Sequence, residues 1–553
     1  MRSCLYLLQL VVVGGLLSAC ASQATLTGGP KDVAPPEMKE CQPPSGSTFF
    51  DGNKVEITFN EFFSLNAPND SILINPPLQK TPDYTIKGKK LVIGFKEELK
   101  PNTTYHISFN GAVQDITEGN RLRQQDILFS TGSQTDSFSI KGFVYDAYTR
   151  QPLPQTCVLL YSEPNDSNPI THKPDYFTLT DNRGHFRFDH LPNRNFQLFA
   201  VEDHNKNRLF DLPDEKIAFL PDNKPVMASY ILSDSSLQNN TFNLYIFQEK
   251  EQKIKLLRKS EQFFGCHLFV FNQAIDTFAL LSMENSPAPC ITVKNAGKDS
   301  LHIYLTDTTI PSNSRWAVIA NGSIIDTISL QSVAVLPTGK DKTIPHFQLT
   351  CPDKVEIDSL CRISSNLPIR RIDTMAFTLT EIDSKDTLTI SPVPVTPFPM
   401  YMTINYPLQP RKQYVLEAAD SICQAYNGQF NDSIRFKFSI KSAKEYGNLA
   451  LHLHFPEKNH YIVQLADAQN GKTLYERLIS PDDMSEGSRT DLTFSNIKEK
   501  SYRLRIIRDD NHNGKWDTGD YLRQQQAESL FYNSQAWEVK KNWTIEENLE
   551  ITF

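Results

Sequence analysis

Apolar and polar residues alternate in short runs along most of this chain. Clear examples are residues 55–59, 104–109 and 184–188, where every second side chain is apolar. Successive side chains of a strand point to opposite faces of a sheet, so this period predicts half-buried β-strands. Turn residues separate the runs, among them 34 prolines and many Asn, Asp and Gly clusters. The pattern predicts an all-β chain built from tandem β-sandwiches.

Two features stand outside this alternation. Helical periodicity is scarce, and residues 249–264 are the best candidate for a short helix or a linker. Trp537 and Trp543 lie near the last alternating run. Because large aromatic side chains bury the most apolar surface, both are expected in a core.

Two sequence modules recur in the same order along the chain. The pattern Leu-x-Pro-x-x-x-Tyr that ends at Tyr105 returns at Tyr414, 309 residues later, and Gly119 and Gly428 have the same separation. A second module contains Asp203-x-Asn-x-Asn, which returns 306 residues later at Asp509. Turn chemistry alone does not reproduce a common spacing in two different modules. We therefore expect two copies of a pair of sandwiches, with a further β-rich segment between them.

The N-terminus has the features of a secretory segment. Arg2 precedes an uncharged apolar run at residues 5–17, which is shorter than a membrane-spanning helix and leads into Leu17-Ser18-Ala19-Cys20. These residues resemble the bacterial lipobox, which implies cleavage before Cys20 and lipidation of its thiol with acyl chains, palmitate among them. An ordinary secretory signal with a coincidental Cys20 is the alternative. Two or more acyl chains provide a lasting membrane anchor.

Composition narrows the classes of function. The net charge of −8 provides no basic stripe, so nucleic acid is not an expected partner. Seven cysteines remain besides Cys4 of the signal segment and Cys20 at the lipid site, without a CxxC pair. This spacing indicates neither a zinc knuckle nor a disulfide scaffold. Cys351 and Cys361 are close enough in sequence to form a disulfide, and buried free thiols are the alternative.

Several motifs resemble known families. Residues 33–132 contain Pro44-Ser45-Gly46, the Leu99-to-Tyr105 pattern and a closing Phe129-Ser-Thr-Gly, and they resemble the SbsA-type bacterial Ig-like domain. Residues 137–233, with Gly142-x-Val-x-Asp and Thr180-Asp-x-x-Gly-x-Phe, resemble a carboxypeptidase-regulatory, transthyretin-like sandwich. The layout resembles lipoproteins of the Bacteroidota, and both modules are usually noncatalytic.

These observations predict seven segments. They are a lipoprotein signal peptide (1–19), a lipidated tether (20–32), an Ig-like domain (33–133), a transthyretin-like sandwich with an acidic loop (137–248), an unassigned β-rich domain (250–342), a second, divergent Ig-like domain (346–442) and a second sandwich with an acidic loop (446–553).

The two acidic loops are the sharpest candidates for a functional site. Oxygen-bearing residues occupy positions 1, 3, 5, 9 and 12, the spacing of an EF-hand calcium loop. The second loop also has Gly514 at position 6, where the first has Arg208. An Asx-rich turn without an ion is the alternative. We predict calcium ligands, whose role is to stiffen the sandwich, at Asp203, Asn205, Asn207, Asp211 and Asp214 and at Asp509, Asn511, Asn513, Asp517 and Asp520.

No sequence motif indicates catalysis. The chain contains neither a Gly-x-Ser-x-Gly elbow nor HExxH nor a P-loop. His452 and His454 lie on one strand face, where they could bind a metal or simply face solvent. We expect a noncatalytic scaffold or accessory subunit of a cell-envelope complex for outer-membrane assembly or export. A surface adhesin or glycan-binding lipoprotein is the alternative, and an enzyme in the middle segment is a third reading.

The expected location is the outer membrane, where the lipid holds the protein and an outer-membrane protein is the expected partner. Ala21 follows Cys20, whereas an Asp there resembles an inner-membrane retention signal. Residues 22–25 lack the acidic cluster that resembles a surface-export signal. The sequence therefore leaves both the periplasmic and the surface orientation open.

Overall fold

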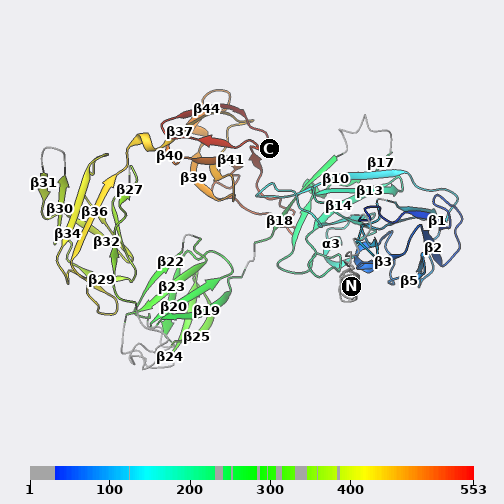
Figure 1. Ribbon diagram of the computed structural model, residues 1–553, viewed down its shortest axis with the longest axis horizontal. Coiled ribbons are helices and arrows are strands. Elements are labelled where there is room, and N and C mark those ends of the chain that lie inside the picture. Colours follow the sequence, from blue (N-terminus) through cyan, green and yellow to red (C-terminus); the bar gives the residue numbers. More distant parts are fainter. Residues whose placement is uncertain are drawn as a thin grey trace, which may run out of the picture. The chain divides into compact units, whose positions relative to one another are not determined.

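The structure, a computed structural model, describes residues 31–123, 125–230, 241–250, 253–263, 265–282, 287–295, 297–306, 314–330, 345–357, 359–382 and 387–553. The signal segment and Cys20 lie outside these residues. The chain divides into two compact units, Met1–Asp146 with Gln151–Ile246 and Ala147–Arg150 with Phe247–Phe553. Strands dominate both units (Figure 1), so the prediction of an all-β fold of tandem sandwiches is confirmed. Among the described residues, no helix has the length and apolar character needed to cross a membrane.

The first sandwich begins the first unit and has three sheets. Their strand orders are β1-β2-β6-β5, β3-β8 and β4-β7-β9. A single helical turn, α2 (Pro68–Ser71), precedes β4. The strands are β1 (Met38–Gln42), β2 (Lys54–Phe59), β3 (Phe63–Leu65), β4 (Leu73–Asn75), β5 (Asp83–Lys87), β6 (Lys90–Gly94), β7 (Thr104–Ser108), β8 (Val113–Asp115) and β9 (Ile127–Ser130). The alternating side chains of β2 and β6 enter a core that includes Ile57, Leu91 and Phe129, all fully buried.

The second sandwich completes the first unit. Its main path is β12-β11-β14-β15-β18-β10-β13, with β16 on β14 and β17 on β10. Strands β10 and β18 run parallel, whereas β11–β12, β11–β14, β14–β15 and β10–β13 are antiparallel pairs. The elements are β10 (Phe138–Asp146), β11 (Cys157–Tyr161), α3 (Asn168–Thr171), β12 (Tyr176–Leu179), β13 (His185–Leu191), β14 (Asn195–Val201), β15 (Lys216–Phe219), η1 (Pro221–Asn223), β16 (Val226–Met227), β17 (Ser229–Tyr230) and β18 (Thr241–Gln248). Val144, Leu160 and Phe186 lie in its core.

The middle segment forms two sheets of its own in the second unit, with orders β19-β20-β23-β22 and β21-β24-β25. The strands are β19 (Leu256–Phe263), β20 (Cys266–Phe271), β21 (Phe278–Ser282), β22 (Cys290–Lys294), β23 (Ser300–Leu305), β24 (Ser314–Ala320) and β25 (Ser323–Leu330). The expectation of a helix or linker at residues 249–264 is therefore wrong for β19. This polar stretch becomes a strand because it pairs with the apolar β20, across two register shifts.

The remaining two sandwiches repeat the strand orders of the first two. Orders β26-β28-β33-β32, β29-β35 and β30-β34-β36 correspond to the three sheets of the first sandwich, with β27 and β31 added to the last. These strands are β26 (Leu349–Thr350), β27 (Lys354–Val355), β28 (Arg362–Ser365), β29 (Ile369–Ile372), β30 (Phe377–Ile382), β31 (Thr387–Ile390), β32 (Val395–Phe398), β33 (Tyr401–Ile404), β34 (Gln413–Ala418), β35 (Cys423–Ala425) and β36 (Ile434–Ile440).

The last sandwich repeats the second one in the same way. It has the orders β40-β37-β44 and β39-β38-β41-β42, with β43 on β41, and β37 runs parallel to β44 as β10 does to β18. Its elements are η3 (Ala443–Glu445), β37 (Gly447–His454), β38 (Tyr461–Asp467), β39 (Thr473–Ile479), η4 (Pro481–Asp483), β40 (Arg489–Ile497), β41 (Lys500–Arg508), β42 (Leu530–Tyr532), β43 (Trp537–Val539) and β44 (Thr544–Glu550). The module repeat seen in the sequence therefore has a counterpart in topology.

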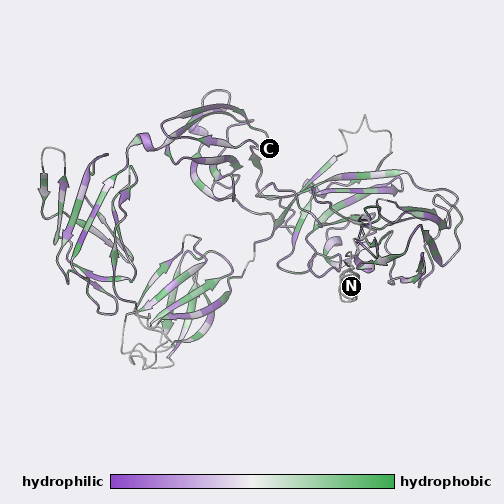
Figure 2. Ribbon diagram, viewed as in Figure 1, coloured by the Kyte–Doolittle hydropathy of each residue, from purple (hydrophilic) through white to green (hydrophobic). Residues whose placement is uncertain are grey.

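Apolar residues fill the core of each sandwich, and green and purple positions alternate along many strands in Figure 2. Cys266 and Tyr304 of the middle segment join the core of the sandwich that follows it. The middle segment buries Phe269, and the last sandwich buries Leu451 and Trp537. The expectation of a core position is confirmed for Trp537, which is 4% exposed, and wrong for Trp543, which is 65% exposed. Trp543 lies in the tight turn between β43 and β44, so its side chain has no sheet face to enter.

Candidate functional site

The first acidic loop connects β14 to β15 and is organised by its own short side chains. The Asp203 carboxylate accepts hydrogen bonds from the backbone N–H groups of Asn207 at 3.1 Å and Arg208 at 2.7 Å. Asn205 Oδ1 accepts from the N–H of Asn207 at 3.0 Å, and Asn207 Oδ1 from that of Leu209 at 2.7 Å. Asx side chains readily bond to backbone a few residues ahead, which is why this sequence wraps into a tight loop.

Two carboxylates close the first loop. Asp211 receives the side-chain amide of Asn205 at 3.0 Å and that of Asn207 at 2.8 Å. Glu215 is 1% exposed, and its carboxylate accepts hydrogen bonds from the backbone N–H groups of His204, Asp211 and Leu212 at 3.0–3.2 Å. A buried carboxylate with three such donors is well compensated for its loss of water.

The second loop, between β41 and β42, has the same internal geometry. The Asp509 carboxylate accepts hydrogen bonds from the backbone N–H groups of Asn513 at 3.1 Å and Gly514 at 2.8 Å. Asn511 Oδ1 accepts a hydrogen bond from the N–H of Asn513 at 3.1 Å. The amides of Asn511 and Asn513 again point to one carboxylate, that of Asp517. The two loops therefore match bond for bond at positions 1, 3, 5 and 9.

Glu528 takes the place of Glu215 in the second loop. Its carboxylate accepts from the N–H groups of Asp510 at 3.1 Å and Asp517 at 2.9 Å. Burial raises the pKa of Glu528 to about 6. The spacing from the first aspartate differs, because Glu215 follows Asp203 by 12 residues and Glu528 follows Asp509 by 19. Fixed loop spacing therefore misses this residue, although each glutamate lies just before the strand that ends its loop.

The residues predicted at position 12 lie elsewhere. Asp214 points outward, with a side chain that is 69% exposed and 3.3 Å from His204 Nδ1. Asp520 accepts the N–H of Arg523 at 3.0 Å and forms an ion pair with the same residue. The structure thus brings together four of the five predicted residues in each loop, and a glutamate completes each group.

The donor chemistry of the loops suits a hard cation. Carboxylate and amide oxygens are the ligands that Ca²⁺ prefers. Within the described part of the chain, no three His, Cys, Asp or Glu side chains are grouped so that they could hold a metal ion. The asparagine oxygens must therefore complete any ligand set, and the amide nitrogens of Asn205 and Asn207 must turn away from Asp211.

The loops differ at the residue that adopts the strained backbone conformation. Arg208 has φ 64° and its counterpart Gly514 has φ 71°. Glycine populates this left-handed region freely, whereas other L-residues lose roughly 1 kcal/mol or more there. The guanidinium of Arg208 stacks on the ring of Phe177 at 3.7 Å. The first loop therefore keeps a costly residue whose side chain extends out of the loop.

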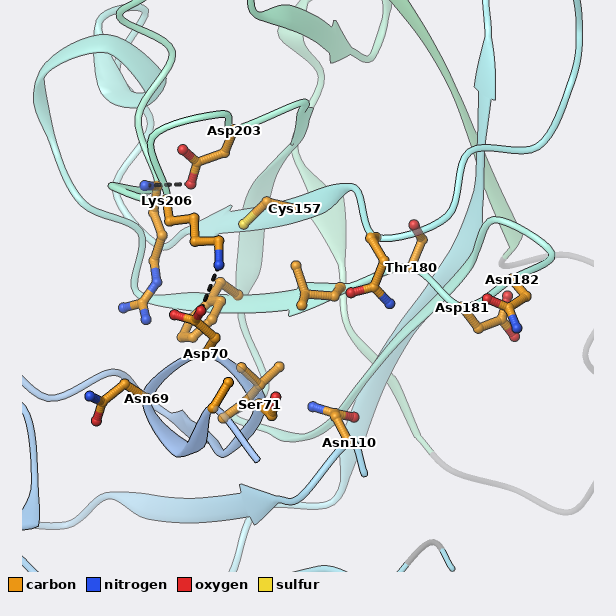
Figure 3. A pocket seen from close by; sticks show the side chains of 16 residues that line it. Asn69, Asp70, Ser71, Asn110, Cys157, Thr180, Asp181, Asn182, Asp203 and Lys206 are labelled. Atoms are coloured by element: carbon orange, nitrogen blue, oxygen red, sulfur yellow. Dashed lines mark hydrogen bonds and ion pairs between the residues drawn. The ribbon is translucent and has the colours of Figure 1, made fainter. Parts of the chain in front are cut away.

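A cleft of about 620 Å³ adjoins the first loop within the first unit (Figure 3). Asn69, Asp70 and Ser71 of α2 line one wall, and Asp203, Lys206 and Arg208 of the loop line the other. Lys206 Nζ lies 2.6 Å from Asp70 Oδ2 across the opening. Cys157 also borders the cleft, and burial raises the pKa of its thiol to about 12. A thiol of this kind stays protonated and is a poor nucleophile.

The two strand histidines face carboxylates. His452 lies 2.6 Å from Asp491 through Nδ1 and 3.0 Å from Glu546 through Nε2, and His454 Nδ1 lies 2.7 Å from Glu550. Hydrogen bonds to Asp491 and Glu546 raise the pKa of His452. The side chains are exposed, so the cluster is a charged strand face.

The protein is therefore an all-β protein of consecutive sandwiches with ordered, Asx-rich loops. Residues 32–131 match the family of the bacterial Ig-like domain, so the first sandwich is a domain of that kind. No curated protein matches the chain.

Three solved structures share some likeness. The S-layer protein rSbsC(31-844) is 11% identical over 85% of this chain and 65% of that chain, with a TM-score of 0.13. BcpA, the major pilin subunit of Bacillus cereus, is 10% identical over 75% of this chain and 98% of that chain, with a TM-score of 0.16. Alpha-2-macroglobulin from Escherichia coli, spanning domains MG0-NIE-MG1, is 11% identical over 51% and 97%, with a TM-score of 0.17. At these TM-scores the likeness carries no argument about function.

Proposed function

We propose that this protein is a noncatalytic outer-membrane lipoprotein that acts as a scaffold or accessory binding subunit of a cell-envelope complex. The observation that supports the proposal is the series of small sandwiches, in which each of two topologies is present twice. The first, the second and the last sandwich each have an apolar core of their own. Repetition of small domains extends a chain and multiplies its surfaces. We expect such a series to position binding surfaces and to extend their reach.

Lipidation at Cys20 provides the anchor in this proposal. The lipobox-like residues lead directly into a tether that is followed by the bacterial Ig-like domain at residues 32–131. A multiply acylated cysteine holds a protein on a membrane far longer than a single chain does. The second and last sandwiches are then transthyretin-like modules in a lipoprotein of the Bacteroidota type.

An exposed sheet edge offers a way to bind a partner. Strand β39 is the outer strand of the sheet β39-β38-β41-β42. Its Leu474 and Leu478 are exposed, Leu478 at 63%. An extended segment of another protein can add to such an edge through backbone hydrogen bonds, with pockets for alternate side chains. We assign the outer-membrane protein partner to this edge.

Calcium has a mechanical role in the proposal. Asp203, Asn205, Asn207 and Asp211 hold the ion in the first loop, and Glu215 orders the backbone around them. Asp509, Asn511, Asn513 and Asp517 hold it in the second, where Glu528 has the same supporting role. A bound ion cross-links positions that lie between two strands, so it restricts the motion of the loop and stiffens the sandwich.

Affinity purification from native membranes tests the scaffold role. A tag at the C-terminus and a mild detergent should recover a stable complex with an outer-membrane protein. Cys20→Ser should leave the protein unlipidated and remove it from the membrane fraction. Leu478→Asp should release the partner while the protein stays membrane-bound. Recovery of the lipidated protein without any partner contradicts the scaffold role.

A further inference from the structure

The cleft beside the first acidic loop continues into a second hollow of about 240 Å³ in the same unit. Asn69, Phe177, Lys206 and Arg208 border both hollows, so the two share a wall. The larger lies between α2 of the first sandwich and β12 with the acidic loop of the second. A ligand long enough to enter both must pass the side chains of Lys206 and Arg208.

The smaller hollow is basic, although the protein as a whole is acidic. Lys80, Lys173, Lys206 and Arg208 line it, and no Asp or Glu does. Lys206 is paired with Asp70. The ammonium groups of Lys80 and Lys173 have neither a hydrogen bond nor an ion pair with any residue that the structure describes. In a chain of net charge −8, such a collection of unneutralised cations favours an anionic ligand.

Arg208 provides the directional part of this basic site. Its guanidinium carbon lies over the ring of Phe177, 3.7 Å from the ring centroid. Within the described residues, the guanidinium N–H groups make no hydrogen bond or ion pair. Burial lowers the pKa of Arg208, and the charges of Asp203 and Asp70 oppose this shift. A desolvated, immobilised guanidinium has little freedom left to lose when it binds a carboxylate or phosphate in bidentate fashion.

The duplicated loop provides an internal comparison. The first loop retains Arg208 at a left-handed position where the second loop has Gly514, and Lys206, at φ 59°, stands where the second has His512 at φ 62°. The bonds that build the two loops are otherwise the same. The loops therefore differ at Lys206 and Arg208, the two loop residues that line both hollows. Backbone strain that the loop itself does not require points to a role for the side chain.

The larger hollow has a different, mostly neutral polar lining. Its three carboxylates are already engaged, because Asp70 pairs with Lys206, Asp203 accepts from the first loop, and Asp181 accepts from Arg183 and His185. Five neutral polar side chains in the lining make no hydrogen bond with described residues: Asn69, Ser71, Asn110, Gln155 and Asn182. Amides and hydroxyls that both donate and accept match the many hydroxyl groups of a saccharide.

We propose that these two hollows form a binding site for an anionic saccharide, a sugar chain that carries carboxylate or phosphate groups. The anionic group binds Arg208 with support from Lys80 and Lys173, and the sugar hydroxyls bind the amides and hydroxyls of the larger hollow. The site goes beyond the scaffold role, and it belongs to the first unit, whereas the edge strand β39 belongs to the second. It binds its ligand and performs no reaction on it.

Calorimetry on the purified full chain tests the site with defined probes. Tetragalacturonic acid tests whether the site takes a saccharide with carboxylate groups. A mannose 6-phosphate oligosaccharide tests whether it takes one with phosphate groups. A neutral galactose tetrasaccharide is the matched uncharged probe. We expect at least one anionic saccharide to bind at least tenfold more tightly than the neutral one, with an affinity that falls as salt rises.

Arg208→Gly provides the decisive variant, because glycine is the residue of the second loop and suits the left-handed backbone. It should reduce binding at least tenfold and leave the melting temperature within about 2 °C of the unmodified protein. Arg523→Gly removes the same charge from an exposed side chain beside the second loop and should leave binding unchanged.

Three outcomes overturn the proposal. They are equal binding of anionic and neutral probes, undiminished binding by Arg208→Gly, and tighter binding of a tetraglutamate peptide than of either anionic saccharide. Recovery of the outer-membrane partner with Arg208→Gly is expected to be normal. Failure of the saccharide site and failure of the scaffold role are therefore distinguishable.

Discussion

The phenol oxygen of Tyr105 accepts a hydrogen bond from the backbone N–H of Lys100 at 2.8 Å. The relationship returns in the second copy of the module, where Tyr414 accepts from the N–H of Gln409 at the same distance. Both rings are buried and stack on a phenylalanine of the last core strand, at 5.6 Å and 5.5 Å. Each tyrosine thus fixes the turn that precedes its own strand, in the manner of a tyrosine corner.

Replacement of either tyrosine by phenylalanine should destabilise its own sandwich. Tyr105→Phe leaves the N–H of Lys100 without its acceptor and keeps the packed ring, so we expect a loss of about 1 kcal/mol. Hydrogen exchange should report faster exchange at residues 99–108 and no change in the second copy. Tyr414→Phe should do the reverse. The control is Tyr401→Phe, because the Tyr401 hydroxyl makes no hydrogen bond with the described residues. Equal exchange in Tyr105→Phe and the unmodified protein contradicts the prediction.

Calcium should bind EDTA-stripped protein at two sites and raise its melting temperature. Loops of this ligand type bind calcium with modest affinity, so at about 100 times the dissociation constant the gain is roughly 2.7 kcal/mol. Calorimetry should give a stoichiometry of two. Asp203→Asn and Asp509→Asn should each reduce it to one. The exposed Asp214→Asn serves as a control and should leave it at two, since its side chain lies beside His204 and faces solvent. An absence of binding heat and of any rise in melting temperature removes calcium from the proposal.

Glu215 and Glu528 should matter more than the aspartates predicted at position 12. Glu528 orders the second loop by accepting two backbone N–H groups. Glu528→Gln keeps the size of the side chain and loses a charged acceptor, which weakens the loop by about 1–3 kcal/mol. Limited proteolysis between β41 and β42 should then accelerate. Asp520→Asn is the matched change and should leave the cleavage rate unaltered.

The stability contributed by His452 should depend on pH. Its pKa is raised in the folded protein by hydrogen bonds to Asp491 and Glu546. A raised folded pKa means that the contribution is fully present below the unfolded value of about 6.5, and is lost as pH rises through the folded value. The urea midpoint of the unmodified protein should exceed that of His452→Gln at pH 5.5, and the two should converge at pH 8.5. Because these groups are exposed, the difference at pH 5.5 should shrink in 0.5 M salt. A difference that grows with pH contradicts this assignment.

Cys351 and Cys361 should form a disulfide on mild oxidation. Their sulfur atoms lie 3.7 Å apart, so a side-chain rotation brings them to bonding distance. A hydrogen bond with Cys361 lowers the pKa of Cys351, which favours the reactive thiolate. Closure of this short loop is worth roughly 2–3 kcal/mol. Intact mass should fall by two hydrogens in the unmodified protein and remain constant in Cys361→Ser. A cross-link to another cysteine would count against the pair.

Local chemistry allowed much of the fold to be predicted. The alternation at residues 55–59 and 184–188 places Val55, Ile57 and Phe186 in cores, and the structure buries all three. The polar β19 departs from prediction because its strand conformation depends on pairing with β20. A strand without its own strong period acquires its structure from its neighbour.

The candidate site also contains residues that local sequence predicts and residues that only tertiary packing places. Asp203, Asn205 and Asn207 could be recognised because their hydrogen bonds join residues within five positions of each other. Glu215 and Glu528 sit at different distances along the chain and reach the same place because each sandwich directs its loop back to the sheet. Spacing alone favours Asp214, which is exposed, and Asp520, which pairs with Arg523.

The sequence by itself determined the all-β class, the repeated modules and the backbone of the acidic loops, because each depends on periodicity or on bonds between near neighbours. Only the tertiary structure decided which carboxylates close the loops and that Arg208 faces a cleft. Those outcomes depend on contacts between segments far apart in the chain, such as Lys206 with Asp70, 136 residues away. Burial and charge at such places come from packing, which no local pattern encodes.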